Sequence, residues 1–151
     1  MNQCIIYGCG RRFDRDKFDP VKNRGVKPEG GLWASPLDSE CGWRDWCISE
    51  DFNLPFPQDR FTFSVIGRVF TVDSVMDAVK LPWIHELGYG CLGIINFEML
   101  IEIGFGAVWL TARGQEATRF SSPSLYGWDC ESVLVLDPDC VHVGEGEPEV
   151  V

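Results

Sequence analysis

Apolar residues along the chain gather in short runs that end at glycine, proline or charged residues, a pattern typical of strands. Runs of this kind lie at 4–7, 32–35, 105–111 and 132–136. The stretch 61–72 alternates apolar and polar residues about Gly67, which predicts a hairpin. The pattern therefore predicts a chain rich in strands.

Apolar residues at helical spacing predict a smaller number of short helices. Their expected positions are 39–50, a segment capped by Asp73 or Ser74 that ends before Pro82, and 94–103. In the first of these helices, Trp43 and Trp46 are expected to face the core. Residues 112–127 are polar and turn-prone and predict a loop.

The order of these elements favours one fold class. Strands outnumber helices and do not alternate with them regularly, which favours an α+β fold with mainly antiparallel strands. A length of 151 residues is that of a single domain. Residues 1–143 are expected to form it, and 144–151, with three glutamates and no cation, an acidic flexible tail.

Composition and charge exclude several classes of protein. A hydrophobic fraction of 45% with 24% charged residues is typical of a globular chain and excludes a disordered, coiled-coil or collagen-like one. The net charge of −10 opposes nonspecific binding to nucleic acid. Residues 1–30 hold seven of the 13 cations and a local charge of +3, a pattern typical of a solvated surface segment and also compatible with a place where an anion binds.

Targeting, cysteine and catalytic motifs are few. The longest apolar region, 92–110, is interrupted by Asn96, Glu98 and Glu102, and no secretory signal is recognisable, so a cytoplasmic location without membrane contact is expected. Seven cysteines without a Cys-x-x-Cys pair, beside His85 and His142, favour reduced thiols and no metal site. The usual nucleotide-binding, serine-hydrolase and metalloprotease motifs are absent.

Three distant segments carry a further pattern. They are Ile5-Ile6-Tyr7-Gly8, the stretch from Lys27 to Pro36 that contains Gly-Gly-Leu-Trp-Ala-Ser-Pro, and Tyr126-Gly127-Trp128-Asp129-Cys130-Glu131. This pattern resembles the ADP-ribosyltransferase family, whose active site takes one residue from a first strand, a hydroxyl from a second and a glutamate from the start of a late strand. The resemblance implies two packed, mostly antiparallel sheets with flanking short helices and NAD, as substrate, in the cleft between them.

The resemblance also implies the catalytic residues. Glu131 matches the family's glutamate, and a carboxylate bound to the ribose stabilises the positive charge that develops as nicotinamide departs. Ser35 matches the second-strand hydroxyl and is expected to orient that carboxylate, although Trp33 stands where the family has a further hydroxyl. Tyr7 occupies the first-strand position, usually histidine or arginine, and is expected to contact NAD.

Further residues are expected to bind NAD around this centre. The rings of Trp33, Tyr126 and Trp128 are suited to stacking on nicotinamide. The cations Arg24 and Lys27 lie in the basic segment and are suited to the diphosphate.

A macromolecular acceptor, expected to be a protein, completes the reaction. Residues 112–127 are expected to form the loop that faces it, with Gln115 and Asp129 as contacts.

Two other interpretations fit the same composition. One is an acidic binding inhibitor that blocks a basic, nucleic-acid-binding surface of a partner protein without catalysis. The other is an effector enzyme that applies the same transfer chemistry to a host macromolecule. An inhibitor would spread carboxylates over an outer face, whereas a transferase would hold Glu131 in a cleft with Ser35.

Overall fold

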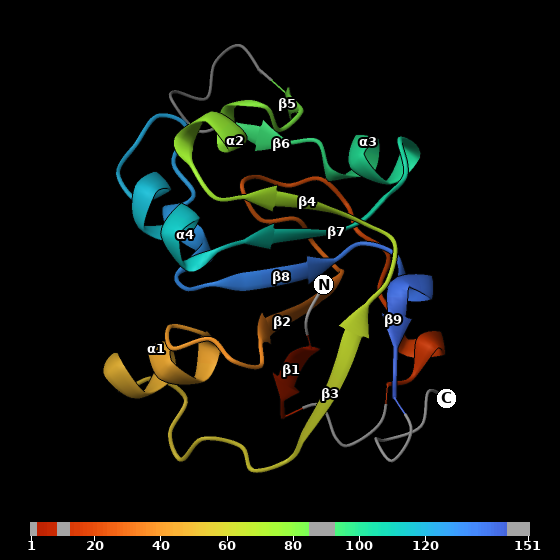
Figure 1. Cartoon of the computed structure of the whole chain (residues 1–151), viewed down its shortest axis with the longest axis vertical. Helices are drawn as coiled ribbons and strands as arrows, with labels where there is room; N and C mark the ends of the chain where they lie inside the picture. The colour runs from red at the N-terminus through yellow and green to blue at the C-terminus, as the bar shows by residue number, and fades with distance from the viewer. Residues whose placement is uncertain (1–2, 9–12, 85–92, 145–151) are drawn as a thin grey trace.

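The fold is built on one large twisted sheet, seen in the computed structural model, which describes residues 3–8, 13–84 and 93–144 (Figure 1). Seven strands follow the order β4-β7-β8-β2-β1-β3-β9, and only β4 and β7 are parallel among neighbouring pairs. The strands are β1 (Gln3–Tyr7), β2 (Leu32–Pro36), β3 (Arg60–Val65), β4 (Arg68–Val72), β7 (Phe105–Leu110), β8 (Ser132–Val135) and β9 (Val141–His142). A small second sheet pairs β5 (Trp83–Ile84) with β6 (Ile94–Ile95).

The large sheet has two halves that share a core. In Figure 1, β4, β7 and β8 run across the view, whereas β3 and β9 run almost perpendicular to them. Side chains that alternate along each strand point to opposite faces. One face of β7 and β8 therefore packs on the β1–β3 half, through residues such as Phe63, Ala107 and Val133. The opposite face, with Val108 and Leu134, is covered by helices and by β5–β6.

Four short α-helices flank the sheet. They are α1 (Trp43–Ser49), α2 (Val75–Val79), α3 (Phe97–Glu102) and α4 (Ala112–Thr118). The last three each begin where a polar side chain accepts a hydrogen bond from a backbone N–H of the first turn, and these caps are Ser74, Asn96 and Thr111. The predicted α+β class is confirmed, in the form of one large sheet, a small second sheet and few helices.

Three predictions of local structure are wrong. β3 and β4 do not form a hairpin, because the chain turns at Gly67 (φ 96°) and carries β4 into the other half beside β7. Part of the predicted loop 112–127 is helix α4, whose buried residues are Gly114 and Thr118, so no apolar stripe revealed it. Trp43 and Trp46 stack on one another half-buried, and in α1 only Cys47 is buried.

Two further expectations concern the chain's ends and its relation to membranes. The predicted acidic tail falls almost wholly on residues 145–151, which lie outside the described residues. Within the described residues, no helix has the length and apolar character that crossing a membrane requires.

Candidate functional site

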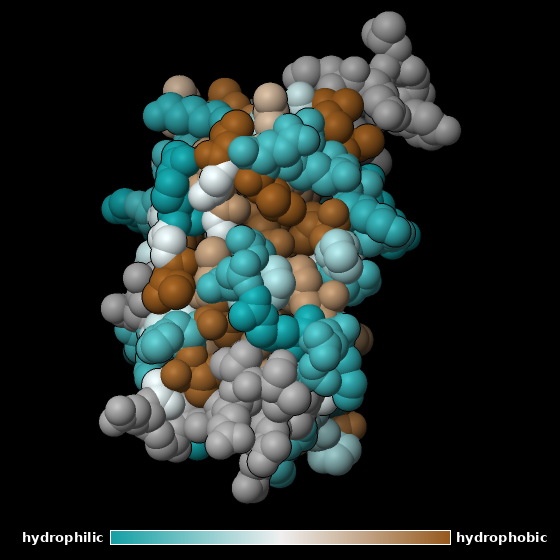
Figure 2. Space-filling model, turned by 90° about the vertical axis from the view of Figure 1, so that its right-hand side faces the viewer, coloured by the Kyte–Doolittle hydropathy of each residue, from teal (hydrophilic) through white to brown (hydrophobic). Residues whose placement is uncertain are grey.

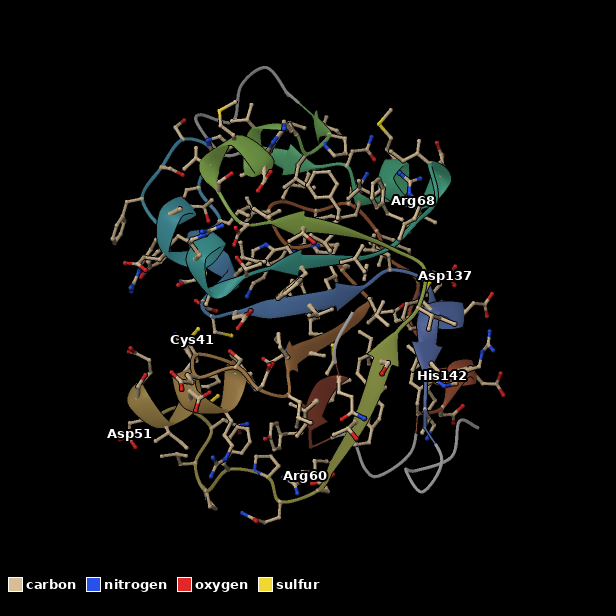
Figure 3. The ribbon with its side chains drawn as sticks, viewed as in Figure 1. Cys41, Asp51, Arg60, Arg68, Asp137 and His142 are labelled. Carbon is tan, nitrogen blue, oxygen red and sulfur yellow. The ribbon has the colours of Figure 1, made fainter. Side chains whose placement is uncertain are left out.

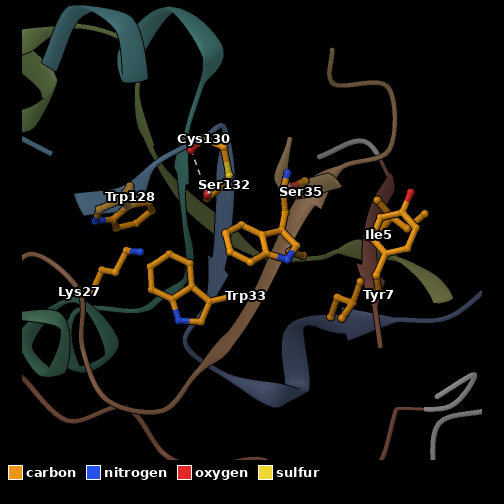
Figure 4. A pocket seen from close by; sticks show the side chains of 11 residues that line it. Ile5, Tyr7, Lys27, Trp33, Ser35, Trp128, Cys130 and Ser132 are labelled. Atoms are coloured by element: carbon orange, nitrogen blue, oxygen red, sulfur yellow. Dashed lines mark hydrogen bonds between the residues drawn. The ribbon is translucent and has the colours of Figure 1, made fainter. Parts of the chain in front are cut away.

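A hollow of about 290 Å³ opens where β1, β2 and the segment before β8 meet (Figure 4). We call it the aromatic pocket. Its rings and polar groups are Tyr7, Trp33, Trp43, Trp128, Lys27, Ser35 and Ser132, with Ile5, Ile6, Ala34 and Cys130 completing the wall. Its volume is at the lower end of the range for small-molecule sites, about 300–1,000 Å³.

Strand pairing explains why residues so far apart in sequence share this pocket. β1 pairs with β2 so that Ile5 lies opposite Ser35, and β2 pairs with β8 so that Ala34 lies opposite Val133. Because side chains alternate, Trp33 and Ser35 project to the face opposite Ala34. Ser132 projects to the same side from β8 and lines the pocket with them.

The aromatic wall is held in place by its own contacts. The ring of Trp128 is 2% exposed, and its indole N–H donates to the carbonyl of Val26 at 2.7 Å. Trp33 meets Trp128 edge to face with ring centres 4.8 Å apart. Across the pocket, Tyr7 lies beside Ile5 (Figure 4) and packs edge-on against Phe56 at 4.9 Å. The rings of Tyr7 and Trp33 remain partly exposed and are the ones a flat ligand could stack on.

Lys27 supplies positive charge at the pocket wall. Its Nζ lies 5.5 Å from the centre of the Trp33 ring and 3.3 Å from Oδ2 of Asp129. Asp129 has φ 63°, a left-handed conformation that is costly for a residue other than glycine. Nε2 of Gln115 donates to the backbone carbonyl of Asp129 at 3.3 Å. Of the two predicted acceptor residues, Asp129 thus pairs with Lys27 and Gln115 is bonded to the backbone of Asp129, and neither of them lines the pocket.

Ser35 ties the sheet to the start of α1. Its Oγ donates to the backbone carbonyl of Glu131 at 3.2 Å and accepts from the backbone N–H of Trp43 at 2.9 Å. A Cβ on Gly42 would lie 2.9 Å from Cβ of Ser35, so only glycine allows this approach. The expectation that Ser35 orients the Glu131 carboxylate is wrong, because the hydroxyl is bound to main-chain atoms.

The Glu131 carboxylate lies in a neighbouring hollow of about 720 Å³, which we call the carboxylate groove. Its walls are Pro36, Asp38, Ser39, Glu40, Cys41, Trp109, Ala112 and Glu131. Oε1 accepts from Oγ of Ser39 at 2.6 Å, and Oε2 accepts from the indole N–H of Trp109 at 3.0 Å. Because its neighbours Cys130 and Ser132 both line the aromatic pocket, alternation directs Glu131 away from that pocket. Glu131 and Ser35 are thus adjacent through the backbone but face different hollows.

The remaining predicted residues lie outside both hollows. Arg24 is exposed and pairs with Glu29 at 3.7 Å. Tyr126 is 54% exposed and stacks on the exposed ring of Phe120 at 5.9 Å. Neither lines the aromatic pocket.

Among the residues of the two hollows that were not predicted as site residues, three carry rings or hydrogen bonds that define the site. Trp43 lines the aromatic pocket, and Ser39 and Trp109 bind the Glu131 carboxylate. Trp109 pairs with Val133, and Glu131 lies two residues before Val133, so the side chains of Trp109 and Glu131 project to the same face. In the sequence, the available signal was the alternation of side chains along the two predicted strands.

Two buried cysteines close to the site, Cys130 and Cys4, are poor nucleophiles. Burial raises the pKa of the Cys130 thiol to about 11, and burial raises the pKa of Cys4 to about 12. Both remain protonated at neutral pH and are poor nucleophiles. No group of three or more metal-ligating side chains occurs in the part of the chain that the structure describes.

The geometry therefore provides a ring-lined pocket with one cation, and beside it a carboxylate whose two oxygens are hydrogen-bonded. Such a pocket suits a ligand that joins a flat ring to an anionic group. The chain matches no family model, no curated protein and no solved structure.

Proposed function

We propose that the aromatic pocket binds NAD and that the chain is a mono-ADP-ribosyltransferase acting on a macromolecular acceptor. In this reaction the bond between ribose and nicotinamide breaks, and its electron pair leaves with nicotinamide. The ribose carbon then bonds to a nucleophile of the acceptor, which loses a proton.

The observation that carries the proposal is the meeting of Tyr7, Trp33 and Trp128 in one pocket with Lys27. The three rings come from three distant segments of the chain. The partly exposed rings of Tyr7 and Trp33 offer stacking surfaces beside a cation, and the buried ring of Trp128 supports Trp33 from behind. A volume of about 290 Å³ accommodates one ring of the dinucleotide and its sugar rather than the whole molecule. The diphosphate is the part of NAD that Lys27 is suited to bind.

The transfer step makes a specific demand on Glu131. Its carboxylate must reach a ribose hydroxyl, yet it is bound to Ser39 and Trp109 in the carboxylate groove. NAD binding must therefore exchange at least one of these hydrogen bonds for one to the ribose. A carboxylate placed there would stabilise the developing charge of the sugar ring.

Binding and transfer are tested separately. Calorimetry with NAD measures binding, and labelled NAD with a cell lysate measures transfer. Glu131→Gln keeps the size of the side chain, so it should leave NAD affinity within about threefold and abolish transfer, a loss of at least about 100-fold. Glu102→Gln at the exposed end of α3 is the matched control and should change neither.

The two measurements distinguish two kinds of failure. Absence of NAD binding by the unmutated protein would overturn the whole proposal. Binding without transfer would leave a nucleotide-binding protein and remove the enzymatic part.

A further inference from the structure

A second group of rings lies next to the aromatic pocket and faces outward. Trp43 and Trp46 of α1 stack with ring centres 5.2 Å apart and 12° between their planes. Phe52 meets both rings edge-on, at 5.9 Å from Trp43 and 5.5 Å from Trp46. Because Trp43 also lines the aromatic pocket, this cluster continues directly from the pocket wall.

The cluster is only partly covered by the protein. Phe52, in the turn after α1, is 50% exposed. Ile48 of α1 and Leu54 of the same turn are about equally exposed. We call these residues, with Trp43 and Trp46, the α1 surface. Stacked rings beside aliphatic side chains at a protein surface are typical of contact sites for another molecule.

The backbone that presents Phe52 is strained. Asp51 and Asn53, its two neighbours, both have φ 54°, and in the described residues only one other non-glycine residue, Asp129, has positive φ. A left-handed conformation costs a non-glycine residue on the order of 1 kcal/mol, although less for Asp and Asn. The turn therefore holds Phe52 against the two tryptophans at some cost to stability.

The charge around the α1 surface is of one sign. Residues 38–51 contain five carboxylates and a single cation, Arg44. Of these acids, Glu50 and Asp51 are exposed at the outer end of α1, where Figure 3 labels Asp51. No ion pair with a cation of the described residues neutralises them. An apolar patch with an acidic border favours a basic, apolar partner and repels phosphate groups.

We propose that the α1 surface docks a basic amphipathic segment of a partner protein. The partner's apolar side chains cover Ile48 and Phe52, and its lysines or arginines face the acidic border. Its role as acceptor rests on the function proposed above: a segment docked here lies beside the aromatic pocket, because Trp43 belongs to both. The acceptor is then a basic protein rather than a nucleic acid.

The test uses peptides of known composition and needs no NAD. The probe is an amphipathic Lys/Leu helix, compared with its Glu/Leu and Lys/Ser counterparts and with single-stranded DNA. Calorimetry should show that the full-length protein binds the Lys/Leu peptide at least about tenfold more tightly than the other three, since tenfold corresponds to about 1.4 kcal/mol. Equal or tighter binding of the Glu/Leu peptide or of DNA would overturn the proposal.

Matched variants locate the binding surface. Glu50→Lys with Asp51→Asn removes acid from the border and keeps a residue that tolerates the left-handed conformation at 51. Glu102→Lys with Glu116→Gln makes the same change in charge at exposed positions on α3 and α4. The first pair should weaken binding of the Lys/Leu peptide by at least about tenfold, and the second by less than about threefold.

The apolar contribution has its own control. Ile48→Ser should weaken peptide binding by at least about fivefold, because it removes an exposed anchor. Ile103→Ser removes a similarly exposed isoleucine next to α3 and should leave binding unchanged. Figure 2 shows the side of the molecule on which α3 lies, where apolar and polar atoms are interleaved. Equal losses in the two variants would overturn the assignment to α1. Failure of NAD binding with peptide binding intact would overturn the transferase proposal but not the docking surface.

Discussion

The aromatic pocket and the carboxylate groove lie on either side of the β2–β8 pair, and they differ in what their polar groups already bind. In the groove, both oxygens of Glu131 accept hydrogen bonds from the protein itself. In the pocket, Ser35 and Ser132 are also hydrogen-bonded within the protein, and Lys27 pairs with Asp129 and lies over Trp33, but the partly exposed rings need no polar partner. A flat ligand can therefore stack in the pocket without displacing a hydrogen bond, whereas a ligand that binds the Glu131 carboxylate must replace one.

The comparison also separates proximity from orientation. Ser35 and Glu131 are 96 positions apart and are joined by a hydrogen bond, as a shared site would require. The bond nevertheless ends on a carbonyl of the main chain, and the two side chains face different hollows. Pairing of β2 with β8 is thus sufficient to bring the residues together but does not decide which side chains meet.

Trp128→Ala should have the largest effect, because this ring belongs both to the wall of the aromatic pocket and to the buried core. The ring is 2% exposed and packs on Trp33, so its loss leaves a cavity and should lower the free energy of unfolding by about 3–5 kcal/mol. Urea denaturation measures the loss. Phe120→Ala, at a ring that is 84% exposed, is the control and should cost less than about 0.5 kcal/mol. A small effect of Trp128→Ala would mean that the pocket wall is not anchored as described.

Ser35→Ala should have an intermediate effect and reaches both hollows. The change removes one donor and one acceptor and leaves the N–H of Trp43 and the carbonyl of Glu131 without this partner. We expect a loss of about 2 kcal/mol in the free energy of unfolding. Proteolysis near α1 should become faster, because Ser35 is what ties the helix start to β2. Ser49→Ala, an exposed serine at the end of α1, is the control and should change neither measurement.

An unchanged stability of the Ser35→Ala variant would contradict the structural role assigned to this hydroxyl. It would also restore the catalytic role as an explanation for a serine at this position, if transfer of ADP-ribose were lost at the same time.

Much of the sheet could be predicted because several of its strands have a clear signal in the local sequence. β1, β2, β7 and β8 coincide with apolar runs that end at glycine, proline or polar residues, so burial and chain breaks alone locate them. The meeting of Tyr7, Trp33 and Trp128 was also predicted, from the resemblance of three segments to a family pattern rather than from periodicity.

The wrong predictions have a common physical cause: each feature depends on which distant segment of the chain it packs against or pairs with. The alternation in 61–72 shows which residues are buried but not that Phe70 pairs with Val108 instead of with β3. Helix α4 packs Gly114 directly against the backbone of Val72, a contact that no apolar periodicity reports. The direction of Glu131 depends on where β8 begins, and a shift of one residue reverses it.

A smaller difference is expected in the rate of alkylation of two thiols, one from each hollow. Cys130 is buried in the wall of the aromatic pocket, whereas Cys41 is exposed at the carboxylate groove. At about pH 8 an alkylating reagent should modify Cys41 first and reach Cys130 only as the protein unfolds. Mass spectrometry of the labelled peptides measures the order. Early labelling of Cys130 would show that the pocket opens to solvent more than its rings suggest.

Ionisation of Cys130 should lower the free energy of unfolding at alkaline pH. Burial raises the pKa of Cys130 from 9.0 to about 11, so the folded state retains a proton that the unfolded state releases. Its contribution is fully present below about pH 9 and is lost as the pH rises towards about 11, and about 1 kcal/mol should disappear between about pH 9 and 10. Cys130→Ala should remove this part of the slope and leave the part due to Cys4, whose pKa is raised to about 12. Cys130, Ser132 and Trp33 line the same pocket. If Cys130→Ala left the dependence of stability on pH unchanged, water would have access to the thiol in the folded protein. Water in this wall would weaken the interaction of a ligand with the pocket.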